Sequence, residues 1–369
     1  MDHERRRRAL AARLPELDAD ALLITRLPNV RYLTGFSGSN GQLLLTGDGG
    51  VFLTDGRYAG QSRREVPDLR LEIYAGDFAA AFGTVAADLE VGRVGFESAG
   101  LTHQSFTQLC TAAPGVELIP TRQEVERLRA VKDPEEVRLL DAAQEITDAA
   151  FEGILDRAVE GVTERRMAFE LDTFLREQTA DGLAFDTILG FGENAAEPHH
   201  HPTDRPLRRG DFIKMDFGCV VGGYHSDMTR TVAFGGPPRR LIEIYDVVRR
   251  AQQAGVDAAR PGATCGQVDA AARDVIRAAG LGDAFPHGLG HGVGLEIHEA
   301  PSLRTGNDEP LAAGHVVTVE PGVYLDGVGG VRIEDMVEVT ADGPRVIPRT
   351  PKELIVLSPI SSRPERNGG

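Results

Sequence analysis

The sequence predicts a small α/β domain followed by a larger α+β domain. The chain has 369 residues, which exceeds the size that a single hydrophobic core usually serves. Short apolar runs alternate with helical patterns in the first third, as they do in α/β domains. Amphipathic helices are mixed with antiparallel hairpins in the remainder, and this mixture favours an α+β domain.

The first domain is expected over residues 1–128. Its strands are predicted where short apolar runs end at polar or turn-forming residues, and its helices where the apolar period lengthens. The predicted strands are residues 21–24, 42–45, 51–54, 69–74 and 93–97, and the predicted helices are residues 77–89 and 102–113.

The second domain is expected over residues 129–360, and residues 361–369 are expected to form a disordered tail. Asp133 followed by Pro134 has the pattern of a helix N-cap and first helical position, which places the boundary just before them. The predicted elements that follow are helices at residues 163–178, 238–259 and after the capping box of Thr264 and Gln267, and strands at residues 315–325 and 330–340.

Charge and cysteine content exclude several classes of protein. The 56 acidic and 40 basic residues give a net charge of -16, which opposes binding to nucleic acid. Cys110, Cys219 and Cys265 lie far apart without a CxxC pair, so neither a disulfide framework nor a thiolate zinc site is expected. Reduced thiols favour a cytoplasmic location. No run of about 18 apolar residues occurs, so no membrane span is expected.

A run of four arginines, Arg5 to Arg8, lies near the start of the sequence. No apolar segment of signal-peptide length follows it. We expect these side chains on the solvent-facing side of a helix whose apolar side carries Leu10 and Leu14, in preference to a contact with nucleic acid.

A hairpin in the second domain places two aspartates where burial is expected. Residues 213–234 have the pattern of two strands joined by a two-residue turn at Gly222–Gly223. In this register Gly218 lies opposite Asp227, and Asp216 is a diagonal neighbour on the same face, roughly 7–8 Å away at the backbone. Like charges so placed repel each other unless they share a cation. The alternatives are that both point to solvent, or that Asp227 caps a turn.

The following segments add carboxylates and histidines. Glu320 ends an apolar run, and Arg332 and Glu334 share one face of a strand whose other face is apolar. A charged inner face is costly without a partner. His287 and His291 lie in a glycine-rich segment that does not match HExxH, and a histidine in such a loop is more often structural.

Together these segments supply two aspartates, two glutamates and an imidazole. Their four negative charges would neutralise two divalent cations. Carboxylate-rich sites with one imidazole suit manganese, cobalt or zinc. Paired ions about 3.5–4 Å apart can share a hydroxide and make it nucleophilic near neutral pH.

The segments "MDFGCVVGGYHSDMTRT", "HGLGHGVGLEIHE", "VEPGVY" and "GVRIED" resemble the motifs of the pita-bread metallopeptidases. The resemblance is closest to the Xaa-Pro aminopeptidases (aminopeptidase P) and prolidases. It covers nearly the whole chain, because "NVRYLTGFSGSNG" and "FLTDGRY" resemble their N-terminal domain. It implies an α+β pita-bread catalytic domain preceded by a smaller α/β domain of the creatinase/prolidase type, and a homodimer.

The resemblance also implies two divalent metal ions per chain, with manganese as the first choice and cobalt or zinc as alternatives. Asp227 and Glu334 would bridge the ions, and Glu320 would also carry a proton to the leaving nitrogen. The implied metal ligands are Asp216, Asp227, His291, Glu320 and Glu334.

Four residues match positions near the substrate in this family, namely His199, His287, His298 and Arg332. His298 resembles the histidine that steadies the tetrahedral intermediate. His199 is preferred over His200 and His201 because it follows the proline of the family pattern, although three consecutive histidines are also typical of a wet surface loop. Arg332 matches an arginine beside the metal ligands, and the alternative is a structural ion pair.

The activity implied by the resemblance is hydrolysis of the N-terminal Xaa-Pro bond of peptides, with a metal-bridging hydroxide as nucleophile. The segment "YLTGFSGSNG" favours an aminopeptidase P-like enzyme over a prolidase restricted to dipeptides. Some dipeptide-selective members carry an arginine soon after the position of His298. Here Ser302 stands at the expected position and Arg304 follows slightly later, which weakens the case for a prolidase without excluding it. A non-catalytic peptide-binding module on the same fold is the alternative from another class.

Overall fold

The computed structural model describes residues 1–178 and 180–358. The chain divides into two compact units, Met1–Arg129 and a second unit that begins at Ala130. The sequence placed this boundary between residues 128 and 129. The tail predicted over residues 361–369 lies outside the described residues.

A mixed sheet forms the middle of the first unit, with the strand order β4-β3-β2-β1-β5-β6. Each predicted strand corresponds to an observed strand, whereas the last strand was not predicted because Pro120 interrupts its short apolar run. The strands are β1 (Ala21–Ile24), β2 (Gln42–Thr46), β3 (Gly49–Asp55), β4 (Arg70–Tyr74), β5 (Arg93–Glu97) and β6 (Glu117–Thr121).

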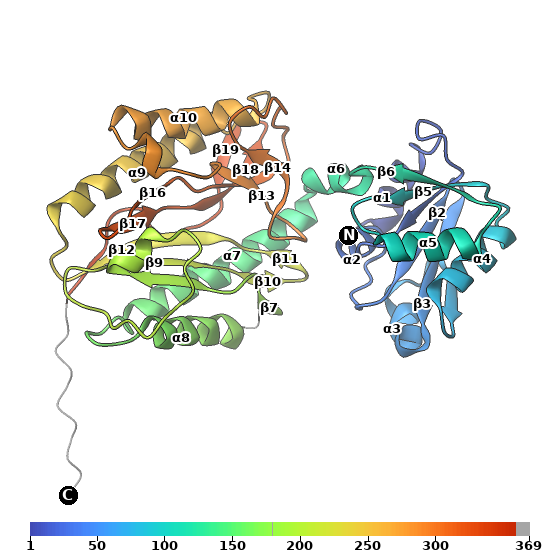
Figure 1. Cartoon of the computed structure of the whole chain (residues 1–369), viewed down its shortest axis with the longest axis horizontal. Helices are drawn as coiled ribbons and strands as arrows, with labels where there is room; N and C mark the ends of the chain where they lie inside the picture. Colours follow the sequence, from blue (N-terminus) through green and yellow to red (C-terminus); the bar gives the residue numbers. More distant parts are fainter. Residues whose placement is uncertain (179, 359–369) are drawn as a thin grey trace, which may run out of the picture. The chain divides into compact units, whose positions relative to one another are not determined.

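Helices pack on this sheet, and α4 and α5 lie together on one face (Figure 1). Alternate strand residues, including Leu23, Leu44 and Leu53, pack with Phe82 of α4, whereas Leu22 points to the opposite face. The helices are α1 (His3–Ala11), α2 (Leu27–Thr34), α3 (Ala59–Glu65), α4 (Phe78–Asp88), α5 (His103–Ala112) and α6 (Glu124–Ala130), with a 3-10 turn at Gly56–Tyr58.

The prediction for the arginines of α1 was wrong at two positions. Arg6 and Arg7 are buried instead of facing solvent. Nη1 of Arg6 donates to the carbonyl of Tyr32 at 3.1 Å, and Nη1 of Arg7 donates to that of Leu33 at 2.8 Å. These carbonyls belong to the last turn of α2, where the unpaired C=O groups attract cations. The local pattern of α1 could not reveal this partner because it comes from another helix.

The second unit contains two main sheets, with the orders β20-β12-β9-β8 and β14-β13-β15-β18-β19. The smaller sheets are β11-β10-β7 and β16-β17. The strands are β7 (Gly182–Leu183), β8 (Ile188–Phe191), β9 (Phe212–Phe217), β10 (Cys219–Val221), β11 (Tyr224–His225), β12 (Met228–Phe234), β13 (Gly290–Gly292), β14 (Glu299–Leu303), β15 (Val316–Val319), β16 (Gly322–Leu325), β17 (Gly329–Arg332), β18 (Asp335–Thr340), β19 (Gly343–Val346) and β20 (Val356–Leu357).

A pair of helices covers the outer face of each main sheet, so that the two sheets lie between the helix pairs (Figure 1). One core joins α9 and α10 to the sheet that contains β15 and β18. The other core joins α7 and α8 to the sheet that contains β9 and β12. The helices are α7 (Pro134–Leu155), α8 (Glu164–Glu177), α9 (Arg239–Ala258) and α10 (Cys265–Ala278), with 3-10 turns at Gly192–Ala196 and Gly282–Ala284. This is the α+β fold that the sequence predicted for the second domain.

The predicted helix starts are confirmed. The Asp133 side chain accepts from the backbone N–H groups of Glu135 and Glu136, both at 2.9 Å, and Pro134 follows it as the first helical residue. Thr264 and Gln267 form the predicted capping box of α10. Each side chain satisfies N–H groups that the first helical turn leaves unpaired.

The aspartate hairpin has the predicted register. Val221 pairs with Tyr224 across the turn, and Asp216 pairs with Thr229, so Gly218 and Asp227 fall opposite each other. Gly222 and Gly223 both have positive φ angles, 58° and 87°, as a two-residue turn of this kind requires.

The single strands expected over residues 315–325 and 330–340 are each divided in two. The first breaks between β15 and β16, at Glu320, and the second breaks between β17 and β18, at Glu334. The halves join different sheets, which the local alternation of side chains cannot show. Each break therefore places a carboxylate where two sheets meet.

Candidate active site

A cavity of about 490 Å³ opens in the second unit, and all nine residues that the sequence singled out lie along it. They come from four different strand regions and from the loop between β8 and β9. Those residues are His199, Asp216, Asp227, His287, His291, His298, Glu320, Arg332 and Glu334.

Asp216 and Asp227 enter the cavity from the hairpin. Asp216 lies in β9 and Asp227 lies just before β12, and both are buried. One oxygen of Asp216 pairs with the guanidinium of Arg332. Its other oxygen, Oδ1, is buried and has no hydrogen-bond partner among the described residues. A buried acceptor without a partner is costly, so this oxygen fits a site that binds a cation.

Glu320 and Glu334 enter from the opposite sheet, at the strand breaks. Oε2 of Glu334 accepts from the hydroxyl of Thr229 at 2.6 Å, which fixes the carboxylate against β12. Oε1 of Glu320 accepts from the hydroxyl of Thr318 at 3.2 Å and lies 3.3 Å from Nε2 of His291. The two carboxylates and the hairpin aspartates therefore converge from two sheets.

The ring of His291 is held in one orientation. Its Nδ1 lies 3.0 Å from the carbonyl of Gly292, and because a carbonyl only accepts, Nδ1 carries the proton. Nε2 is thereby directed at Asp227 Oδ2, 3.6 Å away, and at Glu320. A backbone acceptor on one nitrogen is the usual way to present the other nitrogen to a metal.

The buried carboxylates repel one another. Burial, and then the charges of Glu334, Asp216 and Glu320, raises the pKa of Asp227 well above its usual range. Burial, and then Glu320 and Asp216, raises the pKa of Glu334 in the same way. Burial also raises the pKa of Glu320, but the hydrogen bond and charge of His291 and the charge of Arg332 outweigh it and bring the pKa to about 2. A divalent cation would relieve this repulsion.

The donor set fits such an ion. Asp227, His291 and Glu334 each offer a ligand atom, and these atoms all lie within 4.8 Å of one another. Asp216 and Glu320 flank this group in the same cavity. Three carboxylates or more with one imidazole are the ligands that manganese, cobalt and zinc accept.

A chain of hydrogen bonds that the sequence did not predict runs along one wall of the cavity. Nη1 of Arg332 donates to the hydroxyl oxygen of Tyr324 at 3.1 Å, and that hydroxyl lies 2.9 Å from Nε2 of His287. Nδ1 of His287 donates to the carbonyl of Gly288 at 2.8 Å, so Nε2 accepts the proton of Tyr324. Burial raises the pKa of Tyr324 to about 12 and keeps its hydroxyl protonated. The signal for Tyr324 was its place in "VEPGVY", four residues beyond Glu320 at the strand break.

The remaining histidines divide between the cavity and the interior. The ring of His298 stacks edge-on to that of His291, with 4.2 Å between the centroids. His199 lines the cavity, as predicted, and His201 does so too, although the sequence ranked it lower. His200 points away from the cavity and is buried. The three consecutive rings therefore face the cavity, the interior and the cavity in turn.

Comparison with known proteins identifies the class to which this site belongs. Residues 138–341 match the model of metallopeptidase family M24, and residues 6–131 match that of the creatinase/prolidase N-terminal domain. The chain therefore belongs to metallopeptidase family M24, and it is a peptide hydrolase. Both the predicted family and the predicted pairing of a creatinase/prolidase-type domain with a pita-bread domain are confirmed.

The similarity to individual relatives covers nearly the whole chain. The Xaa-Pro dipeptidase of Pyrococcus horikoshii is 34% identical over 91% of this chain and 94% of its own length. The structure of an Xaa-Pro dipeptidase from Bacillus anthracis is 39% identical, covers 96% of this chain and 100% of its own, and has a TM-score of 0.94. The structure of an X-Pro aminopeptidase from Thermotoga maritima is 34% identical, covers 93% of this chain and 99% of its own, and has a TM-score of 0.87.

No helix in the described part of the chain is both long and apolar enough to cross a membrane. The cysteines of the described residues, Cys110, Cys219 and Cys265, are all free.

Proposed function

We propose that the chain is an Xaa-Pro dipeptidase that uses two divalent metal ions. The observation that supports this most is the convergence of four carboxylates and His291 in one cavity of a peptidase whose relatives bear that name. The sequence alone had favoured an aminopeptidase P-like enzyme, and this remains the second candidate because the X-Pro aminopeptidase of Thermotoga maritima is also similar over 93% of the chain.

The residues that would hold the metal ions are Asp216, Asp227, His291, Glu320 and Glu334. Bound divalent ions would polarise the scissile carbonyl and lower the pKa of water, which suits a bond before proline. That bond is a tertiary amide without an N–H, so an enzyme cannot recognise it through a donor at the scissile nitrogen.

The residues of the chain supply the proton transfers and the contacts. Glu320 accepts a proton from the attacking water and donates it to the proline nitrogen as the bond breaks. A pKa of about 2 keeps this carboxylate ionised, so it carries no proton of its own when the substrate binds. His298 and His199 face the cavity, where they donate to the substrate carbonyl and its developing negative charge. His287 and Arg332, joined through Tyr324, line the wall on which the substrate rests.

Dipeptide selectivity is attributed to Arg304. Both Ser302 and Arg304 line the cavity, and Arg304 is exposed without an ion-pair partner among the described residues. A free guanidinium binds a carboxylate well, and a dipeptide carries its carboxylate on the proline next to the scissile bond. In a longer peptide that position is an amide, which offers no charge.

The test is a comparison of substrates on protein of known metal content. We expect hydrolysis of Gly-Pro with added manganese, and much slower hydrolysis of Gly-Pro-Pro. Arg304→Met should raise KM for Gly-Pro by about tenfold or more while leaving Gly-Pro-Pro unaffected, because only the dipeptide presents a carboxylate there. Faster cleavage of the tripeptide would establish the aminopeptidase instead. Binding without cleavage of either peptide would favour a non-catalytic module.

Two further properties are proposed, a homodimer on the resemblance and a cytoplasmic location on the free cysteines. A homodimer would give twice the chain mass of 39.7 kDa in light scattering. A cytoplasmic location would be checked by fractionation of the cells that produce the protein.

A further inference from the structure

Residues 198–203 form a segment in which the three consecutive histidines, His199 to His201, present their rings alternately to the cavity and to the interior. His199 and His201 are exposed in the cavity wall, whereas His200 is only 5% exposed. The segment has no strand partner, so a sheet does not impose this alternation. Something else must hold His199 toward the reacting atoms.

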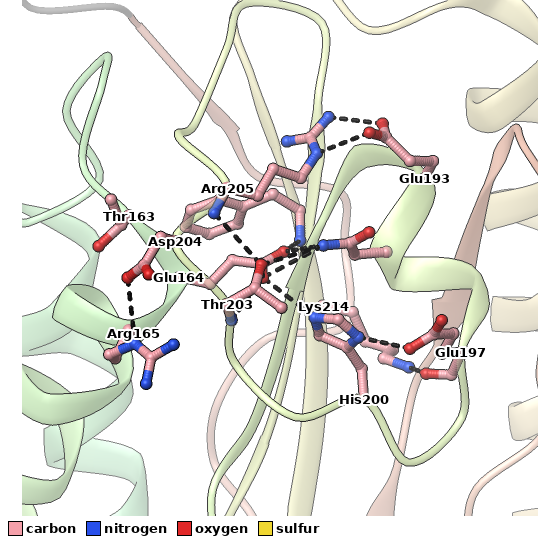
Figure 2. Close-up of polar contacts among 12 residues, drawn as sticks. Thr163, Glu164, Arg165, Glu193, Glu197, His200, Thr203, Asp204, Arg205 and Lys214 are labelled. Atoms are coloured by element: carbon pink, nitrogen blue, oxygen red, sulfur yellow. Dashed lines mark hydrogen bonds and ion pairs between the residues drawn. The ribbon is translucent and has the colours of Figure 1, made fainter.

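His200 is anchored at both ring nitrogens (Figure 2). Its Nε2 lies 3.0 Å from Oε2 of Glu164, and its Nδ1 lies 2.6 Å from Oε2 of Glu197. Glu164 is completely buried, whereas Glu197 is exposed, so Glu164 is the firmer anchor. A hydrogen bond to a buried carboxylate is roughly twice as strong as one between neutral groups.

Glu164 is itself fixed from several sides. It accepts from the backbone N–H of Phe191 at 2.7 Å, from the N–H of Thr203 at 2.9 Å and from the hydroxyl of Thr203 at 2.5 Å. Burial raises its pKa, but these hydrogen bonds and that of His200 outweigh it and lower the pKa below its usual value. It is also the first residue of α8, where the helix dipole favours an anion. The anchor is therefore an ionised and immobile carboxylate.

The other end of the segment is held by two basic side chains. Nζ of Lys214 lies 3.3 Å from the carbonyl oxygen of Pro198, and Nη1 of Arg332 donates to the same oxygen at 3.1 Å. His199 thus lies between a carbonyl held by these two side chains and His200, which is bound to Glu164. Neither contact uses the ring of His199, so that ring stays free to contact substrate.

We propose that His200, through its bond to Glu164, is a positioning residue that fixes the direction of the His199 side chain and of His201 on the same wall. This inference rests on the proposed function, in which His199 contacts the substrate. A misplacement of about 1 Å at such a group costs up to about 100-fold in rate. The consecutive histidines are thereby divided into one structural and two cavity-facing residues.

A double-mutant cycle tests the proposal. His200→Ala should lower kcat on Gly-Pro by about tenfold with little change in KM, because a misdirected His199 stabilises the transition state less while substrate binding is retained. In a His199→Ala background, the same change should have an effect of less than about twofold, since His200 acts through His199. Full additivity of the two effects would overturn the proposal, as would an unchanged kcat for His200→Ala.

Two variants separate positioning from a general loss of structure. His200→Gln keeps a donor for Glu164 and should stay within about threefold of wild-type kcat. Glu193→Ala removes an ion pair of the same loop, to Arg205 at 2.6 Å, on a side that does not line the cavity, and should leave kcat unchanged (Figure 2). Failure of the glutamine to restore activity, or an equal loss of activity in Glu193→Ala, would show that the loop as a whole matters and not the direction of His200.

A readout independent of activity distinguishes this inference from the proposed function. In metal-free protein labelled at histidine Cε1, the His199 resonance is assigned by its absence in His199→Ala. It should shift or broaden in His200→Ala and stay in place in Glu193→Ala. If the His199 resonance does not move in His200→Ala, His200 does not position His199, even if the enzyme is active. A moved resonance supports it even if wild-type protein does not cleave Gly-Pro, in which case only the proposed function fails.

Discussion

At the scale of single residues, the main feature of the cavity is a group of buried carboxylates that lie close together. Asp227 lies beside Glu334 and Asp216, and burial raises the pKa of each of these carboxyls. Arg332 offsets one of the negative charges through Asp216, and His291 offsets that of Glu320. In the metal-free protein these carboxylates therefore repel one another. Binding of a metal ion should relieve the repulsion and raise the free energy of unfolding.

We expect Asp227→Asn to remove most of the stabilisation that metal binding gives. Manganese at about 100 times its Kd should stabilise the wild type by about 3 kcal/mol, and the variant, which lacks one of the proposed ligand carboxylates, should gain far less. Without metal the variant should be the more stable protein because one repulsive charge is gone. Thermal unfolding with and without manganese measures the stability of the metal-free protein and its increase on metal binding. Asp308 is exposed, so Asp308→Asn serves as the control. Equal stabilisation of the variant and the wild type by manganese would contradict the assignment of Asp227.

His315 gives the fold a sensitivity to acid. It is buried, and its Nδ1 accepts from the backbone N–H of Ala312 at 3.2 Å, which requires the neutral ring. Burial, and then the charge of Lys132, lowers its pKa from 6.5 to about 4. The unfolded chain therefore binds more protons between these values, and stability is lost as the pH falls from about 6.5 toward 4.

His315→Gln should remove this dependence. Between pH 7 and pH 5, the wild type should lose on the order of 1–2 kcal/mol more than the variant in urea unfolding. The comparison of these pH-dependent changes, and not of absolute stabilities, excludes the effect of the substitution on packing. Parallel stability curves for the two proteins would show that His315 does not titrate as its burial implies.

At the scale of elements, a helix cap helps to determine where the aspartate hairpin lies. Helix α7 begins at a capping box in which Asp133 accepts from two N–H groups and Glu136 returns a bond to the N–H of Asp133 at 2.9 Å. Glu136 also accepts from the hydroxyl of Tyr224 at 2.8 Å, in the second half of the aspartate hairpin. The start of this helix and the turn of the hairpin are thus directly joined.

Asp133→Ala should destabilise the protein by about 1 kcal/mol, within the roughly 0.5–2 kcal/mol usual for removal of an N-cap. Asp133→Asn is the matched control, since asparagine caps as well as aspartate, and it should be nearly neutral. Chemical denaturation of the two variants gives the comparison. If both were destabilised equally, charge and not capping would be responsible.

At the scale of the whole molecule, each unit has its own sheet and core. The first unit surrounds its mixed sheet with helices, and its core includes Leu23, Leu44 and Phe82. The second unit has two separate cores, one for each sheet and its pair of helices. A unit with a closed core of its own is expected to fold alone.

A fragment of residues 1–129 should therefore unfold in a single cooperative transition. Phe82→Ala in the fragment should cost about 3–5 kcal/mol, because a large ring is removed from the centre of the core. Thermal unfolding followed by circular dichroism tests both. A broad, non-cooperative transition in the unmodified fragment would show that its core is incomplete.

Much of the fold could be predicted from the sequence because the signals are local. The alternation in the hairpin and the turn glycines Gly222 and Gly223 fixed the register that places Asp216 near Asp227. Asp133 and Thr264 marked helix starts for the same reason, since a cap bonds within its own first turn.

What the sequence by itself determined is the set of chemical groups and their spacing along each element. Only the tertiary structure decided which of these groups meet. Arg6 proved to be buried because its partner carbonyl belongs to another helix, and Tyr324 joined the cavity wall through Arg332 and His287. The direction of His200 depends on Glu164, distant in the sequence, and burial and hydrogen bonds across such distances have no local pattern from which to predict them.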